Sequence, residues 1–265
     1  WTMLDVVSGT PPVSSFEAGG AAGATRFYRI GETPDYLPAV RAGVVARIDG
    51  LITDTYLVDQ NTTVGDIRHG QFHNGDNMRL SECTPVLVWA YMQPDSVHFQ
   101  NPAVLNSAIW SMDYMCRAQG SNGGFNEFAS HGWCGVPNRT NGKSSVVGFT
   151  LHGVGNAIAL MAELPEMAAR LSENMDPNGT GTNDTERRTA WKKMLADAMP
   201  FQFSGSGRGH APNQDLCGLM GVFAVNEAYA ALDGGTLLKT QAQLDALTNE
   251  IYYGNPSAAS DRPNG

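Results

Sequence analysis

Charged residues are scarce in this chain, where they make up 16% of the sequence. Acidic residues outnumber basic ones by 26 to 17, and the formal net charge is −9 at pH 7. Proteins that bind nucleic acid need a basic surface to meet the phosphates. The charge balance therefore argues against nucleic acid as a partner. Few charges combined with 30 glycines and many Asn, Ser and Thr residues are more typical of secreted proteins than of cytosolic ones.

Long hydrophobic runs are also missing, since none approaches the length of about 20 residues that a bilayer-spanning helix needs. The longest run extends from Val146 to Met161, and His152, Asn156 and glycines interrupt it. We therefore expect no membrane partner.

Cysteine is rare as well, with only Cys83, Cys116, Cys134 and Cys217 in the chain. Because no two of them have the CxxC spacing of structural zinc sites, we expect no metal and no cofactor. Four cysteines allow three disulfide pairings, and buried free thiols are an equal alternative.

Four Asn-x-Ser/Thr acceptor sites for N-glycosylation support a secreted, extracellular protein. All four lie in segments that we predict to be loops, namely at Asn61, Asn138, Asn178 and Asn183. The chain starts at Trp1 instead of an initiator methionine, so we expect a processed or trimmed product.

Apolar residues at spacings of three and four predict an all-α fold behind an extended N-terminal arm over residues 1–32. Thr33 and Pro34 have the features of a helix start, and Pro102 and Pro212 open two further helices. Pro85 should kink or restart the second helix. No segment alternates with a period of two, so strands should be few or absent. The predicted helices cover residues 33–51, 77–92, 102–119, 153–163, 165–173, 185–199, 212–229 and 237–252.

Short and long connections alternate between these helices, which predicts antiparallel helical hairpins. Ordinary bundles do not need a long aromatic loop at one end of each hairpin, whereas toroids of hairpins use such loops to line a central groove. We therefore expect residues 33–265 to form an incomplete (α/α) toroid with long groove-lining loops.

The stretch from Ser204 to Tyr229 joins a glycine-spaced loop to a helix. The loop carries Arg208 and His210, and Asn213 falls in the first helical turn, where unpaired N–H groups favour an anion. Capping of the helix by Asn213 and Asp215 is the structural alternative. Along the helix the apolar residues predicted to share one face are Leu216, Leu219, Met220, Phe223 and Ala224.

A second long loop, from Gly120 to Lys143, is rich in aromatic and polar residues, as functional loops often are. Phe125 and Trp133 could stack on sugar rings or could seal the core beneath the loop. Asn126, His131 and Arg139 could bind hydroxyls or carboxylates.

The order of three motifs resembles the N-terminal (α/α) toroid of polysaccharide lyase family 8, which includes hyaluronate, chondroitin and xanthan lyases. The first is Met78-Arg-Leu-Ser-Glu-Cys with Ala90-Tyr-Met-Gln-Pro-Asp-Ser, and the second is Val154-Gly-Asn-Ala-Ile-Ala-Leu-Met161. The third, Gly209-His-Ala-Pro-Asn-Gln-Asp215, resembles the turn that carries the family's catalytic asparagine. The family's paired tryptophans are absent before Val154, where Val146 and Val147 stand instead.

The resemblance implies cleavage of an acidic, uronic-acid-containing polysaccharide by β-elimination. Asn213 would bind the uronate carboxylate, with help from Arg208 and His210. The family's catalytic His and Tyr would fall at or beyond Gly265, so we expect a C-terminal remainder of the same enzyme as a partner.

Other interpretations stay open at this point. His152 and Asn156 lie about one helical turn apart, and Asn156 is a further candidate for substrate binding. A glycoside hydrolase on a similar toroid would use Asp215 and Glu127, with Asp76 in reserve. A third possibility is a non-catalytic carbohydrate-binding helical domain.

Overall fold

The computed structural model describes residues 37–52, 70, 77–120, 123–125, 144–175, 185–203 and 212–253. The chain divides into two compact units, Trp1–Ala46 and Arg47–Gly265, and the boundary falls inside the first helix. The predicted arm over residues 1–32 lies outside the described residues, as do the four glycosylation sequons.

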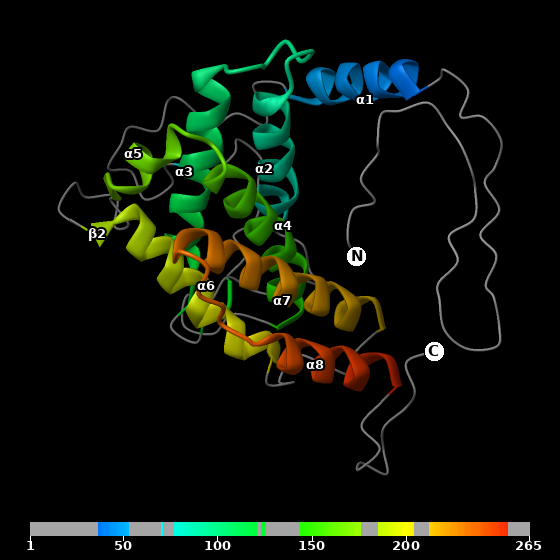
Figure 1. Cartoon of the computed structure of the whole chain (residues 1–265), viewed down its shortest axis with the longest axis vertical. Helices are drawn as coiled ribbons and strands as arrows, with labels where there is room; N and C mark the ends of the chain where they lie inside the picture. Colours follow the sequence, from blue (N-terminus) through cyan, green and yellow to red (C-terminus); the bar gives the residue numbers. More distant parts are fainter. Residues whose placement is uncertain are drawn as a thin grey trace, which may run out of the picture. The chain divides into compact units, whose positions relative to one another are not determined.

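The all-α prediction is confirmed for the part of the chain that the structure describes, which contains eight helices and one small sheet (Figure 1). The sheet pairs two antiparallel strands of two residues each, with Asn174 opposite Glu186 and Met175 opposite Thr185. In chain order the elements are α1 (Leu37–Leu51), α2 (Asn77–Met92), α3 (Pro102–Ala118), α4 (Ser144–Ala162), α5 (Met167–Leu171), β1 (Asn174–Met175), β2 (Thr185–Glu186), α6 (Arg187–Phe203), α7 (Pro212–Leu232) and α8 (Gln241–Tyr253).

Local sequence signals set several helix ends. Asn101 caps α3, since its side chain accepts a hydrogen bond of 3.0 Å from the Ala103 amide, and Pro102 is the first helical residue. Pro212 likewise opens α7. The bounds of α2 match the prediction, but Pro85 lies inside one continuous helix rather than ending a shorter one.

The predicted start of α4, at Gly153, was wrong. The helix begins at Ser144, nine residues before Gly153, so it takes up the segment that directly follows the predicted loop. Val146, Val147 and Gly148 have poor helix propensity, which hid this start. His152 and Asn156 therefore both lie on α4.

Within the unit Arg47–Gly265, α4 is the central helix and packs against both α2 and α7 (Figure 1). α3 packs on α2 and α6, while α6 and α8 pack on α7. The helices α2, α4 and α7 thus form one row of neighbours, and the helices that alternate with them in the chain pack beside that row.

The closest approach between α4 and α7 depends on a glycine. A Cβ atom added to Gly155 would lie 2.5 Å from the carbonyl carbon of Ala224, well inside van der Waals contact. Only a residue without a side chain fits there, and this closeness explains why α4 and α7 share the most extensive interface in the structure.

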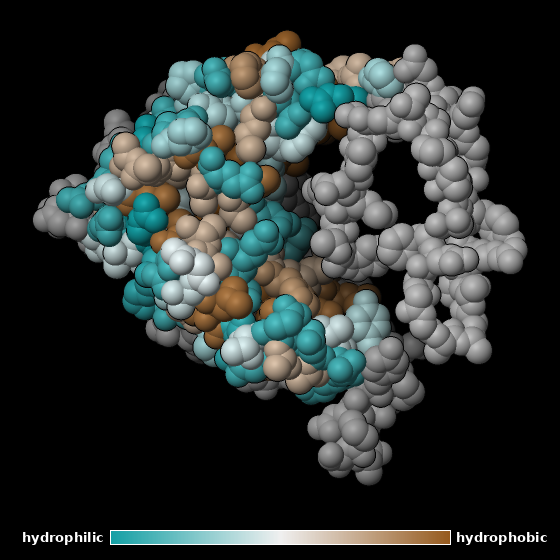
Figure 2. Space-filling view, viewed as in Figure 1, coloured by the Kyte–Doolittle hydropathy of each residue, from teal (hydrophilic) through white to brown (hydrophobic). Residues whose placement is uncertain are grey.

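The predicted apolar face of α7 turns out to be divided. Leu219 and Ala224 are buried, but Leu216, Met220 and Phe223 are exposed, Met220 to 54%. Small residues on the other side of the helix, including Gly218 and Gly221, are buried instead. At the closest approach to α4 only small residues fit, and Leu216, Met220 and Phe223 lie on the exposed side of the helix. On the face seen in Figure 2, hydrophobic residues form small groups among hydrophilic ones.

One described helix is long and apolar enough to cross a membrane by length and composition, namely the part of α7 from Asp215 to Leu232. The expectation that no stretch would reach this length was therefore wrong for α7. Because 56% of this window is buried inside the protein, α7 has the character of a core helix.

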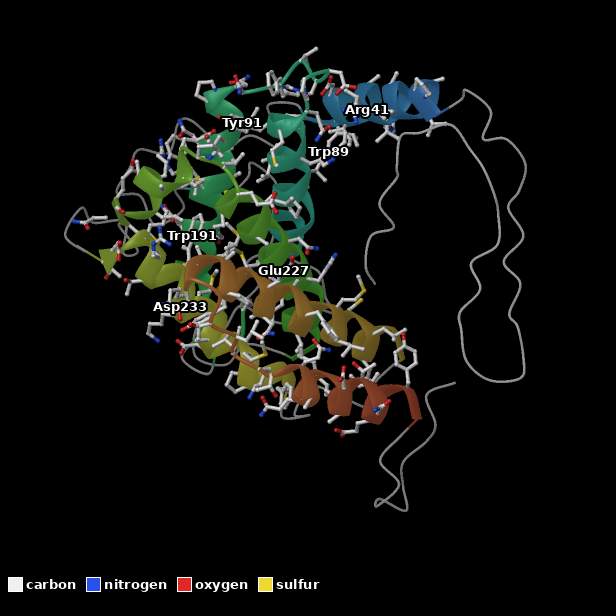
Figure 3. All side chains as sticks on the ribbon, viewed as in Figure 1. Arg41, Trp89, Tyr91, Trp191, Glu227 and Asp233 are labelled. Carbon is white, nitrogen blue, oxygen red and sulfur yellow. The ribbon has the colours of Figure 1, made fainter. Side chains whose placement is uncertain are left out.

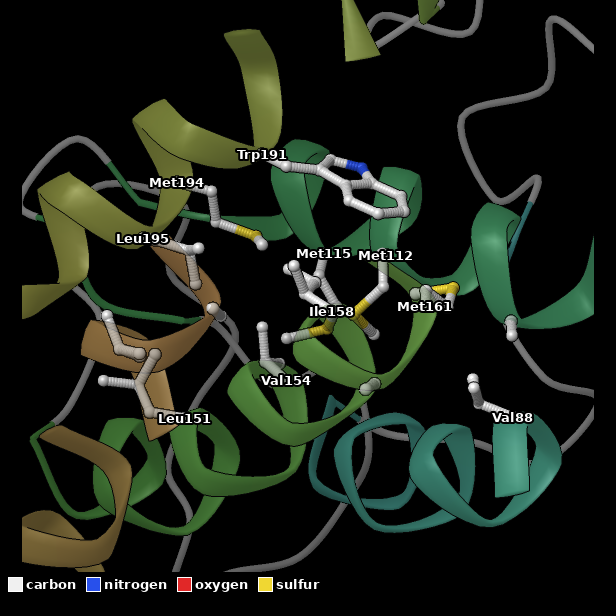
Figure 4. Packing of buried hydrophobic residues seen from close by; sticks show 14 of the residues in the cluster. Val88, Met112, Met115, Leu151, Val154, Ile158, Met161, Trp191, Met194 and Leu195 are labelled. Carbon is white, nitrogen blue, oxygen red and sulfur yellow. The ribbon is translucent and has the colours of Figure 1, made fainter. Parts of the chain in front are cut away.

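Methionine and aliphatic side chains fill the core around Trp191, as Figure 4 shows for α3, α4 and α6. Trp191, Met112, Met115, Ile158 and Met161 are all fully buried. Flexible methionine side chains fill irregular gaps between crossing helices, and this suits a core assembled from several helix pairs.

Candidate functional site

Most of the predicted site residues lie outside the described residues. These are Arg208, His210, Asn126, His131, Trp133 and Arg139. Asn213 is the second residue of α7, and the structure describes only its backbone. The expected position of Asn213 in a first helical turn is thus confirmed, while its contacts stay a prediction.

Phe125 and Asn156 are described in full. Phe125 is 1% exposed and packs within the hydrophobic core, so it is the hydrophobic seal rather than a platform for a sugar ring. Its predicted role in substrate binding was therefore wrong, because a buried ring has no free face. Asn156 is exposed on α4, and His152 on the preceding turn is half-buried.

Of the carboxylates in the hydrolase alternative, only Asp215 is described. It is 6% exposed and lies in the first turn of α7. Glu127 and Asp76 lie outside the described residues, so the separation of the carboxylates stays open.

The base of the loop after α3 is a tightly bonded turn. Gln119 and Phe125 form an isolated antiparallel bridge, and the Gly120 amide donates to the Gly124 carbonyl over 2.7 Å. The side-chain amide of Gln119 donates to the Gly123 carbonyl at 3.0 Å and to the Met194 carbonyl of α6 at 2.9 Å. One side chain therefore joins the turn to the neighbouring helix. Sequence reasoning missed this residue, because a glutamine at a helix end carries no distinctive signal.

Gly123 makes the same turn fit against α6. Its φ of +83° lies in the left-handed region, and an added Cβ would lie 2.0 Å from the Asp197 carbonyl oxygen. No other residue could take this conformation in this space. The turn that ends at Phe125 is therefore fixed to α6 at Met194 and Asp197.

This attachment relates both candidate segments to α6, since the turn before one of them touches α6 and the other follows α6 in the chain. Gly123, which packs against Asp197, lies two residues before Phe125, the last described residue before Asn126, and Phe203 is the last residue of α6 before the segment with Arg208 and His210. Asp197 precedes Phe203 by six helical residues, which span about 9 Å. The helices α4 and α7 follow these two segments in the chain. These two helices pack against each other.

A buried ion pair holds α3 to α6. The Arg187 Nε donates to both carboxylate oxygens of Asp113, at 3.0 and 3.1 Å, and the Trp191 ring N–H donates to Asp113 at 2.9 Å. Arg187 also pairs with Glu173 at 2.8 Å. Burial opposes the charge of Arg187, but the two carboxylates outweigh it and raise its pKa. Figure 3 shows Trp191 on α6 at this interface.

Asp49, Ser96 and His98 lie close together and are the residue types of a catalytic triad. Their hydrogen bonds, however, are not those of a catalytic triad. The Ser96 hydroxyl donates to the Asp49 carboxylate at 2.5 Å, while the His98 ring lies 3.4 Å from the Asp49 carbonyl oxygen. The Val97 amide also donates to Asp49. Since the serine bonds to the carboxylate and not to an imidazole, these contacts anchor the end of α1 to the turn between α2 and α3.

Among the described ranges, no group of three or more His, Cys, Asp or Glu side chains could hold a metal ion. Cys83, Cys116 and Cys217 are present as thiols. Burial raises the pKa of the Cys217 thiol, which disfavours its reactive thiolate form.

Comparison with known proteins gives no relative from which a function could be read. The chain matches no protein-family model, no curated protein and no solved structure.

Proposed function

We propose that this chain is an (α/α) toroid domain of a secreted lyase that cleaves an acidic polysaccharide by β-elimination. In this reaction the protein must offset the charge of a uronate carboxylate, remove the C5 proton, and protonate the leaving glycosidic oxygen. Asn213 binds the carboxylate, and Arg208 and His210 assist it. Trp133, Asn126, His131, Arg139 and Asn156 contact the sugar chain.

The observation that carries this proposal is that α6 touches the turn before one candidate segment and ends directly before the other. Gly123, two residues before Phe125, packs against Asp197, which lies about 9 Å along the axis of α6 from Phe203, and the helices that follow the two segments, α4 and α7, pack against each other. We therefore assign both segments, which are distant in the sequence, to the binding of one substrate. The amide groups of the first turn of α7 add a positive end for an anionic sugar.

The helix arrangement supports the toroid part of the proposal. α2, α4 and α7 are neighbours in one row, and the alternate helices α3, α6 and α8 pack beside them. Repeated hairpins in which every second helix faces the same row are the building plan of an (α/α) toroid. The long segments 53–76, 121–143 and 204–211 each lead into a helix of that row.

The test is a product screen with the natural protein on hyaluronan, chondroitin, heparosan, alginate and xanthan. A lyase generates a new C4–C5 double bond next to the carboxylate, which absorbs in the ultraviolet, together with one new reducing end per cleavage. New reducing ends without that absorbance would support the hydrolase alternative. Binding of an acidic oligosaccharide with neither product would support a carbohydrate-binding domain, and both results would contradict the lyase proposal.

A further inference from the structure

The exposed side of α7 is one narrow line of residues. From Asp215 to Ala230 the helix has four exposed residues, and its other residues are buried or half-buried. The four, called the α7 stripe from here on, are Leu216, Met220, Phe223 and Glu227. They follow one another at spacings of four, three and four, which is the spacing of the contact line in a coiled coil. Since α4, α6 and α8 pack on other sides of α7, the stripe is the side on which the helix can take a further partner.

Apolar side chains dominate the α7 stripe. Leu216, Met220 and Phe223 are 40%, 54% and 39% exposed. The helix is apolar on its other sides too, and a helix that is apolar all round is normally covered all round. Glu227, which Figure 3 labels on α7, is the only charged residue of the stripe and lies at one end of it. An apolar line with one charged end suits a docking surface for another helix.

The α7 stripe is complementary to a second copy of itself. When two α7 helices pair in antiparallel directions about a twofold axis between Gly221 and Val222, Met220 of each copy lies opposite Phe223 of the other. The same register places Leu216 of each copy opposite Glu227 of the other. All four positions of the stripe therefore meet a position of the second stripe, as a twofold-symmetric homodimer contact requires.

The charge of Glu227 fits the end of the helix that it meets in this register. Leu216 follows Pro212, the first residue of α7, by only four residues, which span about 6 Å along the axis. The carboxylate of Glu227 thus approaches the first turns of the second α7, where unpaired N–H groups and the positive end of the helix dipole favour an anion. Asp215, the acidic residue of that turn, is buried and does not belong to the exposed stripe.

From this match of spacing, polarity and charge we propose that the α7 stripe is the contact of a symmetric homodimer. The stripe extends about 16 Å along the helix. A contact between two helices of this length is small beside the roughly 800 Å² per partner of a standard stable interface, so the dimer forms in a concentration-dependent equilibrium with the monomer. The inference does not depend on the lyase proposal, because no residue of the stripe is assigned to the substrate.

The experiment is sedimentation equilibrium of the full chain at a series of protein concentrations. We expect a reversible monomer–dimer equilibrium. Met220→Lys should raise its dissociation constant at least about tenfold, because two ammonium groups would be desolvated in the contact. Leu237→Lys is the matched control, since Leu237 is 51% exposed in the connection between α7 and α8 and lies outside the stripe. The control should keep the dissociation constant of the natural protein.

Two further variants test the register. Phe223→Glu alone should weaken the dimer, whereas the double variant Met220→Lys/Phe223→Glu should associate more tightly than either single variant. In the double variant the ammonium group of each copy faces a carboxylate of the other copy. Glu227→Gln should raise the dissociation constant about two- to fivefold, because the attraction to the helix dipole is lost. Circular dichroism melting curves establish that each variant is folded at the temperature of the measurement.

A protein that stays monomeric at every concentration would overturn the inference. A dimer that Met220→Lys leaves unchanged, or a double variant that associates no better than the single ones, would also overturn it. Sedimentation with phosphatidylcholine vesicles that Met220→Lys abolishes and Leu237→Lys does not would assign the stripe to a membrane surface and contradict the dimer.

Discussion

Gly155 of α4 lies so close to Ala224 of α7 that a Cβ atom on the glycine would be 2.5 Å from the Ala224 carbonyl carbon. This contact belongs to the interface of α4 and α7, the most extensive one between the described helices. It also determines which side of α7 contacts α4, since the small residues of α7 lie on that side. The first turn of α7, with Asn213, is placed by the same packing.

The first prediction concerns this contact. Gly155→Ala should lower the free energy of unfolding by about 1–3 kcal/mol, because the new methyl group meets backbone atoms that cannot move aside. Gly50→Ala on α1 is the control, since nothing lies within 4 Å of its added Cβ atom. Urea unfolding followed by circular dichroism measures both. Equal stability of the two variants would contradict the close packing.

The second prediction concerns the buried pair of Asp113 and Arg187. Both residues are about 5% exposed, so Asp113→Asn leaves a buried guanidinium without its main counter-charge. The expected loss is about 3 kcal/mol in the free energy of unfolding. Asp233→Asn supplies the comparison, because Asp233 pairs with Lys192 at the protein surface.

Asp233→Asn should lower the free energy of unfolding much less, since water solvates both charges of the pair of Asp233 and Lys192. Denaturant titration of the two variants side by side measures the difference. Similar midpoints for Asp113→Asn and Asp233→Asn would contradict the structural importance of the buried pair.

The third prediction concerns pH. Tyr91 is 8% exposed and donates its hydroxyl to Glu166; burial, this hydrogen bond and the Glu166 charge raise its pKa to about 12. The unfolded chain releases the tyrosine proton near its ordinary value of 10.0, so the folded state holds more protons between these values. Stability should therefore be complete below pH 10 and fall as the pH rises toward 12, by about 2 kcal/mol.

Tyr91→Phe should flatten this part of the stability curve, because the titrating hydroxyl is gone. Tyr252→Phe is the control, since Tyr252 is exposed and its loss leaves Tyr91 in place. Guanidinium unfolding at a series of alkaline pH values gives the slopes. A Tyr91→Phe slope equal to that of the unsubstituted protein would exclude Tyr91 as its source.

Local signals predicted some helices well and others poorly. Pro102 and Pro212 gave correct starts for α3 and α7, because the fixed φ of proline acts within one turn. Pro85 lies inside a continuous α2, so the restart that was one of its two predicted effects was wrong, while the kink stays a prediction. Propensity describes the isolated chain, and packing can override it.

The buried face of α7 could not be predicted from hydrophobic spacing. Periodicity gives weight to large apolar residues such as Met220 and Phe223, but the interface with α4 uses glycine and alanine. Burial at a close helix crossing depends on the partner helix, and no local pattern reveals that partner. The two-residue strands of the small sheet are too short for any periodic signal.

The candidate site was predicted in part. The first turn of α7 lies where the Pro212 signal put it, and Asn213 is in that turn. Phe125 was interpreted correctly only in its alternative role as a seal of the core. Gln119 was missed because its role depends on the Met194 carbonyl, which is distant in the sequence and adjacent only in the fold.

The most direct test of the account compares the natural protein with Asn213→Ala in the ultraviolet assay for unsaturated uronate, with the melting temperature measured in parallel. The account predicts that the substitution lowers turnover by at least about a hundredfold, as loss of a transition-state hydrogen bond does, while the melting temperature changes by no more than a few degrees. Turnover that is unchanged, or that falls only in step with the melting temperature, would contradict it.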